Sequence, residues 1–305
     1  MTSPELAAAL GRRLGGSIDG LRRLSGGASR ETWSFRRQGV PLILRRDPPG
    51  VPSKGMTREA DLFRAAAAAG VPVPDLIDAG DDPEILGSAF LVTAHVEGET
   101  IPRKILRDPE FAHARPKLAR QCGEILARLH TVDPAAVPGL EETDQLAQFR
   151  AVLDGVGHAH PAFELAFRWL ESHRPSSTGR AIVHGDFRNG NLIVGPDGVR
   201  AVLDWELAHV GDPLEDLGWL CVKAWRFGVD RPVGGFGTYE DLVAGYGVVD
   251  VDDLRWWEVL GNLKWGIMCI VQTSAHTSGA VRSVELAAIG RRVCEVEWDL
   301  LEMMP

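Results

Sequence analysis

Residues 183–194 read VHGDFRNGNLIV, and this polar loop between apolar runs decides the fold of the chain. Three short β-prone segments surround the loop: Ala181–His184, Leu192–Val194 and Val199–Leu203. The last of them ends directly before Asp204. Asp186 and Asn191 in the loop, together with Asp204, offer the hard oxygen ligands that Mg²⁺ prefers. Asp and Asn are also ordinary turn formers, so the spacing carries the prediction rather than the residue types.

The spacing H-G-D-x-x-x-x-N, followed by a strand and an Asp, resembles the protein-kinase pattern of a catalytic loop and a metal-binding Asp. Together with VLDWELAHVGDPLEDLGWL (202–220), it is similar to the aminoglycoside phosphotransferase and choline kinase family, small-molecule relatives of the protein kinases. The similarity is greatest to the subgroup that also occurs as the N-terminal domain of acyl-CoA dehydrogenase fusion proteins. It runs from about Leu24 to about Cys294.

This resemblance implies a role for each polar residue of the motif. Asp186 would be the catalytic base that accepts the proton of the acceptor hydroxyl, and Asn191 and Asp204 would hold Mg²⁺ against the phosphates of ATP. Arg188 would neutralise charge on the transferring phosphoryl group. His184 would brace the loop by hydrogen bonding, and Asp212 and Asp216 would support it. Capping of a helix N-terminus is the other interpretation of Asp212 and Asp216.

The N-terminal region fits the same resemblance. LSGGASRETWSF (24–35) resembles the flexible phosphate loop of the family, in which backbone N–H groups approach the phosphates of ATP. The residues expected there are Gly26, Gly27 and Ser29. Arg45 stands where kinases usually have a lysine, and Glu59 is placed to pair with it. Arginine is planar and bidentate, so it does not simply replace lysine at a phosphate site.

The segment FLVTAHVEGET (90–100) resembles the connection between the two lobes of a kinase. The adenine edge would meet backbone groups of Ala94 and Val96, and Thr93 would lie at the rear of the adenine pocket. A strand that ends in a Gly-containing turn accounts for the same residues.

The pattern of the whole chain predicts an α+β, bilobal, protein-kinase-like fold. Residues 1–96 would form a small β-rich nucleotide-binding lobe with one helix, and residues 97–305 a larger helical lobe with the catalytic loop and the acceptor site. The expected strands and helices of the first lobe are Thr32–Arg37, Val40–Arg45, Arg58–Ala69 and Ala89–Val96, with a turn at Gln38 and Gly39. The helices expected in the second are Lys117–Leu129, Phe163–Glu171, Leu214–Trp225, Leu254–Val271 and Val284–Leu301. Trp256, Trp257 and Trp265 would pack in its core rather than line an acceptor pocket.

Composition limits the possible functions. The 305 residues carry 33 Lys+Arg and 42 Asp+Glu, a formal net charge of −9, which argues against a nucleic-acid binder. No apolar run approaches the ~20 residues needed to cross a bilayer, so we expect a soluble cytoplasmic protein without membrane contact. Four separated cysteines without a C-x-x-C motif predict buried, reduced thiols. A monomer and a homodimer are both compatible with these features.

The expected function is ATP- and Mg²⁺-dependent transfer of the γ-phosphoryl group to a hydroxyl of a small molecule. A protein kinase is disfavoured because only a short loop separates Asp204 from Asp212, and no A-P-E motif follows. A nucleotide-binding pseudokinase scaffold is the alternative, and Arg45 is its main support. Three acceptor classes remain open: a polycationic aminoglycoside, a hydroxyacyl thioester, and a choline-like cation held by some of the nine tryptophans.

Overall fold

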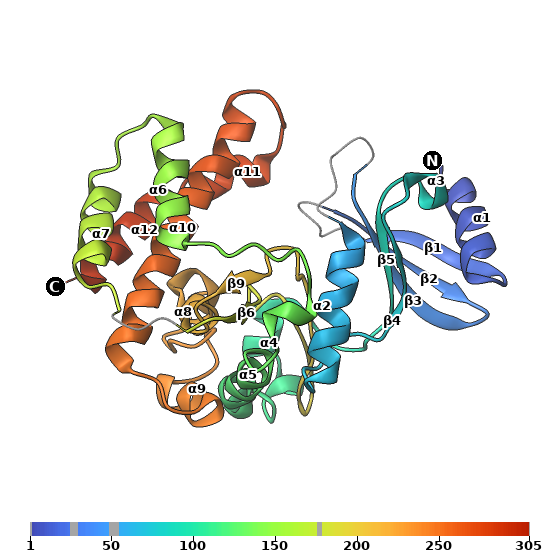
Figure 1. Cartoon of the computed structure of the whole chain (residues 1–305), viewed down its shortest axis with the longest axis horizontal. Coiled ribbons are helices and arrows are strands. Elements are labelled where there is room, and N and C mark those ends of the chain that lie inside the picture. The colour runs from blue at the N-terminus through green and yellow to red at the C-terminus, as the bar shows by residue number, and fades with distance from the viewer. Residues whose placement is uncertain (1, 25–29, 49–54, 176–178, 305) are drawn as a thin grey trace.

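The computed structural model describes residues 2–24, 30–48, 55–175 and 179–304, and it begins with a helix and a five-stranded sheet. The strand order is β1-β2-β3-β5-β4, and every neighbouring pair is antiparallel (Figure 1). Gln38 and Gly39 form the predicted β2–β3 turn, with φ angles of 51° and 84°. The bounds are β1 Ile18–Leu24, β2 Glu31–Arg37, β3 Val40–Arg46, β4 Leu76–Gly80 and β5 Phe90–Ala94.

Helices cover both faces of this sheet. Successive side chains of a strand point to opposite faces, and β5 shows both environments. Phe90 and Val92 pack with α1 (Ser3–Leu14), whereas Leu91 between them belongs to the same core as α2 (Met56–Ala68). The sheet therefore lies between α1 and α2, and α2 joins it to the rest of the molecule (Figure 1). A short helix, α3 (Pro83–Leu86), precedes β5.

The remainder of the described chain is mainly helical. Two antiparallel strand pairs interrupt the helices: β6 (Ala181–Val183) with β9 (His209–Gly211), and β7 (Leu192–Gly195) with β8 (Gly198–Val202). The α-helices are α4 Pro102–Arg107, α5 Arg115–Leu129, α6 Gln145–Val156, α7 Pro161–Ser172, α8 Leu214–Cys221, α9 Tyr239–Tyr246, α10 Val251–Thr277, α11 Val284–Ile289 and α12 Arg292–Met303. Three 3₁₀-helices connect them: η1 Pro109–Phe111, η2 Pro134–Ala136 and η3 Lys223–Arg226.

Two of the expected long helices are interrupted. The helix expected at Leu214–Trp225 ends at Cys221, because Val222 is extended (φ −51°, ψ 133°), and η3 follows separately. The one expected at Val284–Leu301 is divided into α11 and α12 at Gly290, which packs against Thr273 with no room for a side chain. The elements without a predicted range are α1, β1, β4, α3, α4, η1, η2, α6, β9 and α9.

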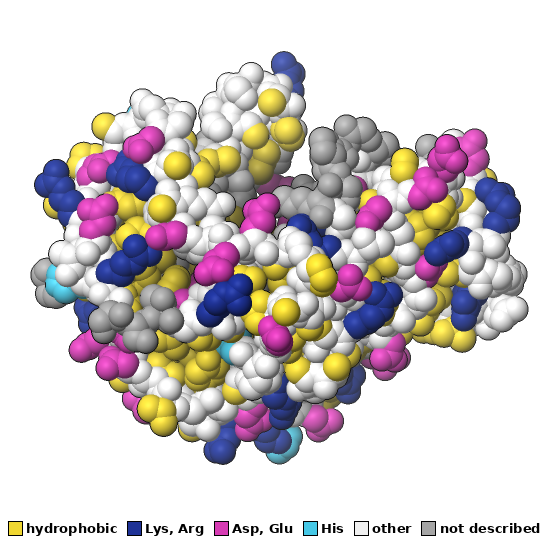
Figure 2. All heavy atoms as spheres, viewed as in Figure 1, with side chains coloured by type: hydrophobic (Ala, Val, Ile, Leu, Met, Phe, Trp, Pro, Cys, Tyr) yellow, Lys and Arg dark blue, Asp and Glu magenta, His cyan; other side chains and the backbone are white. Residues whose placement is uncertain are grey.

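Two further predictions concern the surface. Cys294 is exposed, contrary to the expectation for all four cysteines, whereas the other three are buried. No helix of the described chain is long and apolar enough to cross a membrane. Figure 2 shows basic and acidic side chains interspersed over one face, and a hollow between the helical arm at the top and the sheet.

Candidate active site

A buried carboxylate in the first turn of α8, that of Asp216, supports the backbone of the loop between β6 and β7. Asp216 accepts hydrogen bonds from the N–H groups of His184 (2.7 Å) and Gly185 (2.9 Å). Burial alone would raise the pKa of Asp216, but the hydrogen bond and charge of His130 and the hydrogen bond from the His184 N–H hold it below the usual value. Asp216 therefore braces the loop, as the resemblance implies, whereas Asp212 accepts from the Leu214 and Gly179 N–H groups and so caps α8 instead.

His184 is held inside the loop by its own two ring nitrogens. Its Nδ1 accepts from the Asp186 N–H (3.2 Å), and its Nε2 donates to the Leu203 carbonyl (3.0 Å). This pattern fixes the neutral tautomer with the proton on Nε2. Gly185 has a φ of 78°, and a Cβ there would lie 2.4 Å from the Leu207 carbonyl oxygen, so the loop requires glycine at this position.

Three N–H donors converge on the Asp186 carboxylate. Its Oδ1 accepts from Trp219 Nε1 (2.7 Å) and its Oδ2 from Asn191 Nδ2 (2.6 Å), while Arg188 Nε lies 3.0 Å from Oδ1 and 3.2 Å from Oδ2. The guanidinium of Arg188 also lies over the ring of Trp225, 4.6 Å from its centre. The structure thus brings the two expected catalytic residues, Asp186 and Arg188, into direct contact.

Asp204 and Glu59 lie on opposite sides of the Arg45 guanidinium, which contacts both. Arg45 Nη1 lies 2.9 Å from Glu59 Oε1, and its Nη2 lies 2.5 Å from Asp204 Oδ1. The Arg45–Glu59 contact expected from the sequence is therefore present. Burial raises the pKa of Asp204, but the charge and hydrogen bond of Arg45 outweigh burial and hold the pKa below its ordinary value.

A second arginine, which the sequence analysis did not single out, lies behind this pair. Arg30 contacts the other oxygen of Glu59 and also Asp47 (3.1 Å) and Glu206 (3.4 Å). Glu59 is nearly inaccessible and lies between two guanidinium groups, so it keeps a cationic partner even if Arg45 turns toward another anion. The one available signal was position, since Arg30 directly follows the glycine-rich segment.

The oxygen donors beside this network fit a divalent cation. Asn191 uses its Nδ2 on Asp186, which leaves its carbonyl oxygen as a ligand, and Asp204 has a second oxygen beyond the one bound by Arg45. Two arginines here face four carboxylates (Asp47, Glu59, Asp204 and Glu206), and a cation would offset the excess negative charge. Asp204 also has a φ of 69°, a left-handed conformation that costs a non-glycine residue about 1–2 kcal/mol and is common at functional sites.

The segment after β5 has the backbone groups expected for adenine, with one restriction. The Ala94 N–H already donates to the Asp75 carbonyl (2.8 Å), and the His95 N–H to the Pro41 carbonyl (3.2 Å). Within the described chain no hydrogen bond uses the Val96 N–H. The Val96 N–H is therefore a backbone donor left for a ligand edge. The expected phosphate-loop residues Gly26, Gly27 and Ser29 lie outside the described residues.

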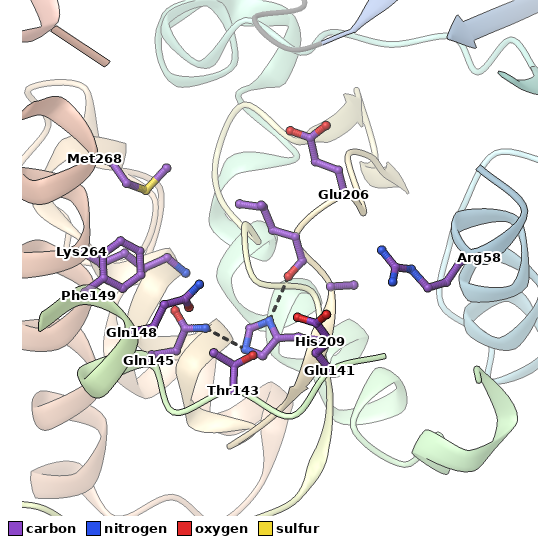
Figure 3. Close-up of a pocket in the computed structure, with 12 residues that line it drawn as sticks. Arg58, Glu141, Thr143, Gln145, Gln148, Phe149, Glu206, His209, Lys264 and Met268 are labelled. Atoms are coloured by element: carbon purple, nitrogen blue, oxygen red, sulfur yellow. Dashed lines mark hydrogen bonds between the residues drawn. The ribbon is translucent and has the colours of Figure 1, made fainter. Parts of the chain in front are cut away.

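A cavity of about 420 Å³ opens beside the loop that follows Asp204 (Figure 3). Phe149 and Met268 lie on one side of it, Arg58 on the other, and Glu206 above (Figure 3). Lys264 and His209 are on its inner wall, and both contact the buried Glu215, at 3.2 and 3.0 Å. The lining mixes cations, carboxylates, amides and apolar side chains, so no single charge dominates it.

The tryptophans separate into two groups. Trp256 and Trp257 are buried in the core of α6, α7, α10 and α12, as expected. Trp265 is only half-buried and lies 4.8 Å from Trp225, whose ring contacts Arg188. Trp219 and Lys264, like Arg30, are site residues that the sequence analysis did not single out. An indole at the end of an apolar helix and one lysine in a long helix give no local signal for them.

Comparison with known proteins agrees with this geometry. A model of the phosphotransferase enzyme family matches residues 20–257. Acyl-CoA dehydrogenase family member 10 of Mus musculus is 34% identical over 217 residues, which covers 64% of this chain and 20% of that protein. The chain spans only 20% to 27% of the length of the curated acyl-CoA dehydrogenase relatives it matches.

Solved structures share the fold over nearly the whole chain. A Ralstonia eutropha protein assigned to the aminoglycoside phosphotransferases superposes with a TM-score of 0.76, at 21% identity and 99% coverage of both chains. Spectinomycin phosphotransferase, solved with ADP and spectinomycin, gives a TM-score of 0.70 at 13% identity, again with 99% of both chains covered. The predicted bilobal, kinase-like fold and the resemblance to the acyl-CoA dehydrogenase subgroup are confirmed. The chain belongs to the phosphotransferase enzyme family and has the fold of its small-molecule kinases.

Proposed function

We propose that this protein transfers the γ-phosphoryl group of ATP, with Mg²⁺, to a hydroxyl group of a small molecule. The observation that carries the proposal is the contact of Asn191 with Asp186, together with the position of Asp204 directly after Leu203, whose N–H donates to the Asn191 backbone carbonyl, and with Arg45 bound to Asp204. Phosphoryl transfer depends mainly on positioning and charge neutralisation, and these are what such a constellation can supply.

In this mechanism the acceptor hydroxyl oxygen attacks the γ-phosphorus as the bond to the β–γ bridging oxygen breaks. The electron pair of that bond leaves with ADP, and the hydroxyl proton passes to the Asp186 carboxylate. Asn191 and Asp204 would hold the metal, which neutralises phosphate charge when bound. Arg188, next to the base, would face the charge on the transferring group.

The nucleotide would lie between the sheet and the helices. The Ala94 carbonyl and the Val96 N–H would bind the adenine edge, and Gly26, Gly27 and Ser29 would approach the phosphates, with Arg45 and Glu59 on the opposite side. The boundary between the nucleotide-binding lobe (residues 1–96) and the helical lobe (residues 97–305) would lie directly after Val96. The ADP held by spectinomycin phosphotransferase supports an adenine nucleotide.

The cavity lined by Lys264, Phe149 and Arg58 is the proposed acceptor site. Asp186 does not line this cavity, but Lys264, which does, contacts the carbonyl of Gly185, the residue before Asp186. An aminoglycoside polycation would favour a mainly acidic lining, whereas this cavity contains Arg58, Lys264 and His209 as well as Glu141 and Glu206. The lining therefore favours a neutral or zwitterionic acceptor over a polycation.

A screen of hydroxyl compounds for stimulated ADP release from Mg²⁺–ATP tests the proposal. Asp186→Asn should bind ATP almost as well as the wild type but turn over about 10²–10⁴-fold more slowly, the usual contribution of a positioned acid–base group. Turnover within a few-fold of the wild type would exclude Asp186 as the base. ATP binding without turnover in the wild type, for every acceptor, would favour the pseudokinase alternative.

A further inference from the structure

Trp219 makes a direct contact with the proposed base that its place in the sequence does not suggest. Its indole Nε1 lies 2.7 Å from Asp186 Oδ1, and its side chain is almost completely buried. An indole N–H can only donate, and it does not titrate, so the contact is insensitive to pH in the indole itself.

Lys264 fixes both Trp219 and the backbone beside Asp186. Its Nζ lies 3.2 Å from the Gly185 carbonyl oxygen, 3.2 Å from Glu215 Oε1 and 4.7 Å from the centre of the Trp219 ring. Lys264 is buried, so its charge is compensated by these groups rather than by solvent. One ammonium group therefore binds the loop on one side of the base and the indole on the other.

The other two donors to Asp186 have further tasks in the proposed reaction. Asn191 would turn its carbonyl oxygen to the metal, and Arg188 would face the charge on the phosphoryl group. Trp219 is the donor whose position depends only on the protein interior. It would hold Oδ1 in place, and the acceptor hydroxyl would then approach Oδ2 beside the contacts that Asn191 and Arg188 make with that oxygen.

We infer that Trp219 is a positioning residue for Asp186. Lys264 contacts both the Trp219 ring and the Gly185 carbonyl and so fixes their positions relative to Asp186. This inference rests on the proposed role of Asp186 as the base. A carboxylate without this donor rotates about its side-chain bonds, and small misplacements of a reacting group are costly in rate.

Trp219→Phe removes the N–H and keeps an aromatic ring for Lys264 to contact. Trp257→Phe is the matched control, because Trp257 is also buried but its Nε1 has no partner within the described chain. With Mg²⁺–ATP, ADP release is measured with water as acceptor and with the best compound of the hydroxyl screen. We expect kcat to fall about ten- to hundredfold in Trp219→Phe, with KM for ATP and the melting temperature close to those of Trp257→Phe. Equal kcat in the two variants would overturn the inference.

The contact itself is tested without turnover, by ¹⁵N NMR of the indole N–H groups. The Trp219 signal is assigned by its loss in Trp219→Phe, and it should move in Asp186→Asn while the Trp257 signal stays in place. If the chemical shift of the Trp219 indole N–H is the same in Asp186→Asn as in the wild type, the inference is also overturned. If the Trp219 signal moves in Asp186→Asn but the wild-type protein releases no ADP with any acceptor, the contact is present and the proposed function is wrong. The positioning role of Trp219 would then be wrong as well.

Discussion

Arg45 satisfies two carboxylates at once, and its planar guanidinium is suited to this task. Glu59 and Asp204 lie on different nitrogens of the same group, at 2.9 and 2.5 Å. A lysine ammonium is a single point of charge on a flexible stem. Arg45, in place of the usual kinase lysine, therefore forms defined contacts with both carboxylates.

Arg45→Lys should weaken ATP binding and lower turnover, because one ammonium cannot keep both carboxylates and also reach the phosphates. Arg45→Ala should be worse, since it leaves Asp204 and Glu59 without a cation between them, although Arg30 still pairs Glu59. ATP affinity and ADP release at one Mg²⁺ concentration measure both effects. A clearly more active Arg45→Lys variant would show that Arg45 is a degraded lysine and would support a pseudokinase.

The surroundings of His209, in the wall of the proposed acceptor cavity, favour its protonated form. Its Nδ1 lies 2.9 Å from the Leu207 carbonyl oxygen, and its Nε2 lies 3.0 Å from Glu215 Oε2 and 3.1 Å from Gln145 Nε2, so each ring nitrogen has an acceptor for a proton. Burial lowers the pKa of His209, as does the charge of Lys264 to a smaller extent. The hydrogen bond and charge of Glu215 outweigh both, so the pKa lies above its ordinary value.

A raised pKa in the folded state stabilises the protein fully below the pKa of an unfolded histidine, about 6.5, and this contribution is lost as pH rises through the folded value. The difference in unfolding free energy between the wild type and His209→Gln should therefore be largest near pH 6 and shrink toward alkaline pH. Urea unfolding from about pH 6 to pH 9 measures it. A difference that is constant, or grows with pH, would contradict a charged His209.

Site residues could be predicted where they belong to one short sequence motif. Asp186, Asn191 and Asp204 follow from a motif within about twenty residues, and Arg45 and Glu59 from their places on a strand and the next helix. Lys264 and Gly185 are 79 residues apart and meet only because α8 packs on α10. Such contacts depend on tertiary packing, which has no local sequence signature.

At the scale of elements, two glycines allow α8 and α10 to approach closely. A Cβ at Gly218 would lie 2.6 Å from the Trp257 backbone carbon, and one at Gly261 would lie 2.7 Å from Val222 Cγ2. This approach places Lys264 beside Trp219 and thus beside the base. The sequence predicted both helices but not their contact, and it did not show that β6 pairs with β9 instead of β7.

Gly218→Ala should destabilise the protein by about 1–3 kcal/mol, because backbone atoms of α10 cannot yield as a side chain would. Gly155→Ala in α6 is the control: a Cβ there meets nothing within 4 Å, so alanine should be neutral or stabilise by up to about 1 kcal/mol. Denaturant unfolding compares the two variants. If both have the stability of the wild type, the helices are not in the close contact described.

At the scale of the molecule, one hydrophobic core joins the sheet to the helices. Met56 and Leu91 from the sheet side and Leu118 and Leu220 from the helical side belong to the same buried cluster. The Arg45–Asp204 ion pair also joins the two parts, since Arg45 lies on β3 and Asp204 follows β8. The sequence predicted the two-part architecture from its change of periodicity, but the continuity of the core required the structure.

Because Arg45 comes from β3 and Asp204 from the segment after β8, a ligand that binds between them should stabilise both parts together. Mg²⁺–ATP should raise the melting temperature of the whole chain in one transition, more than ATP with EDTA does. Differential scanning calorimetry measures this. Two separate transitions, only one of which responds to nucleotide, would show that the parts unfold independently.

The central claim is that Asp204 holds the metal against the phosphates of ATP, and isothermal titration calorimetry tests it most directly. ATP affinity is measured with Mg²⁺ and with EDTA for the wild type, Asp204→Ala and Asp204→Asn. Asp197→Ala, an exposed aspartate in the β7–β8 turn, is the control. The account predicts that Mg²⁺ strengthens ATP binding in the wild type and in Asp197→Ala, and that this gain falls about tenfold or more in Asp204→Ala and less in Asp204→Asn. An unchanged Mg²⁺-dependent affinity in a folded Asp204→Ala variant would contradict it.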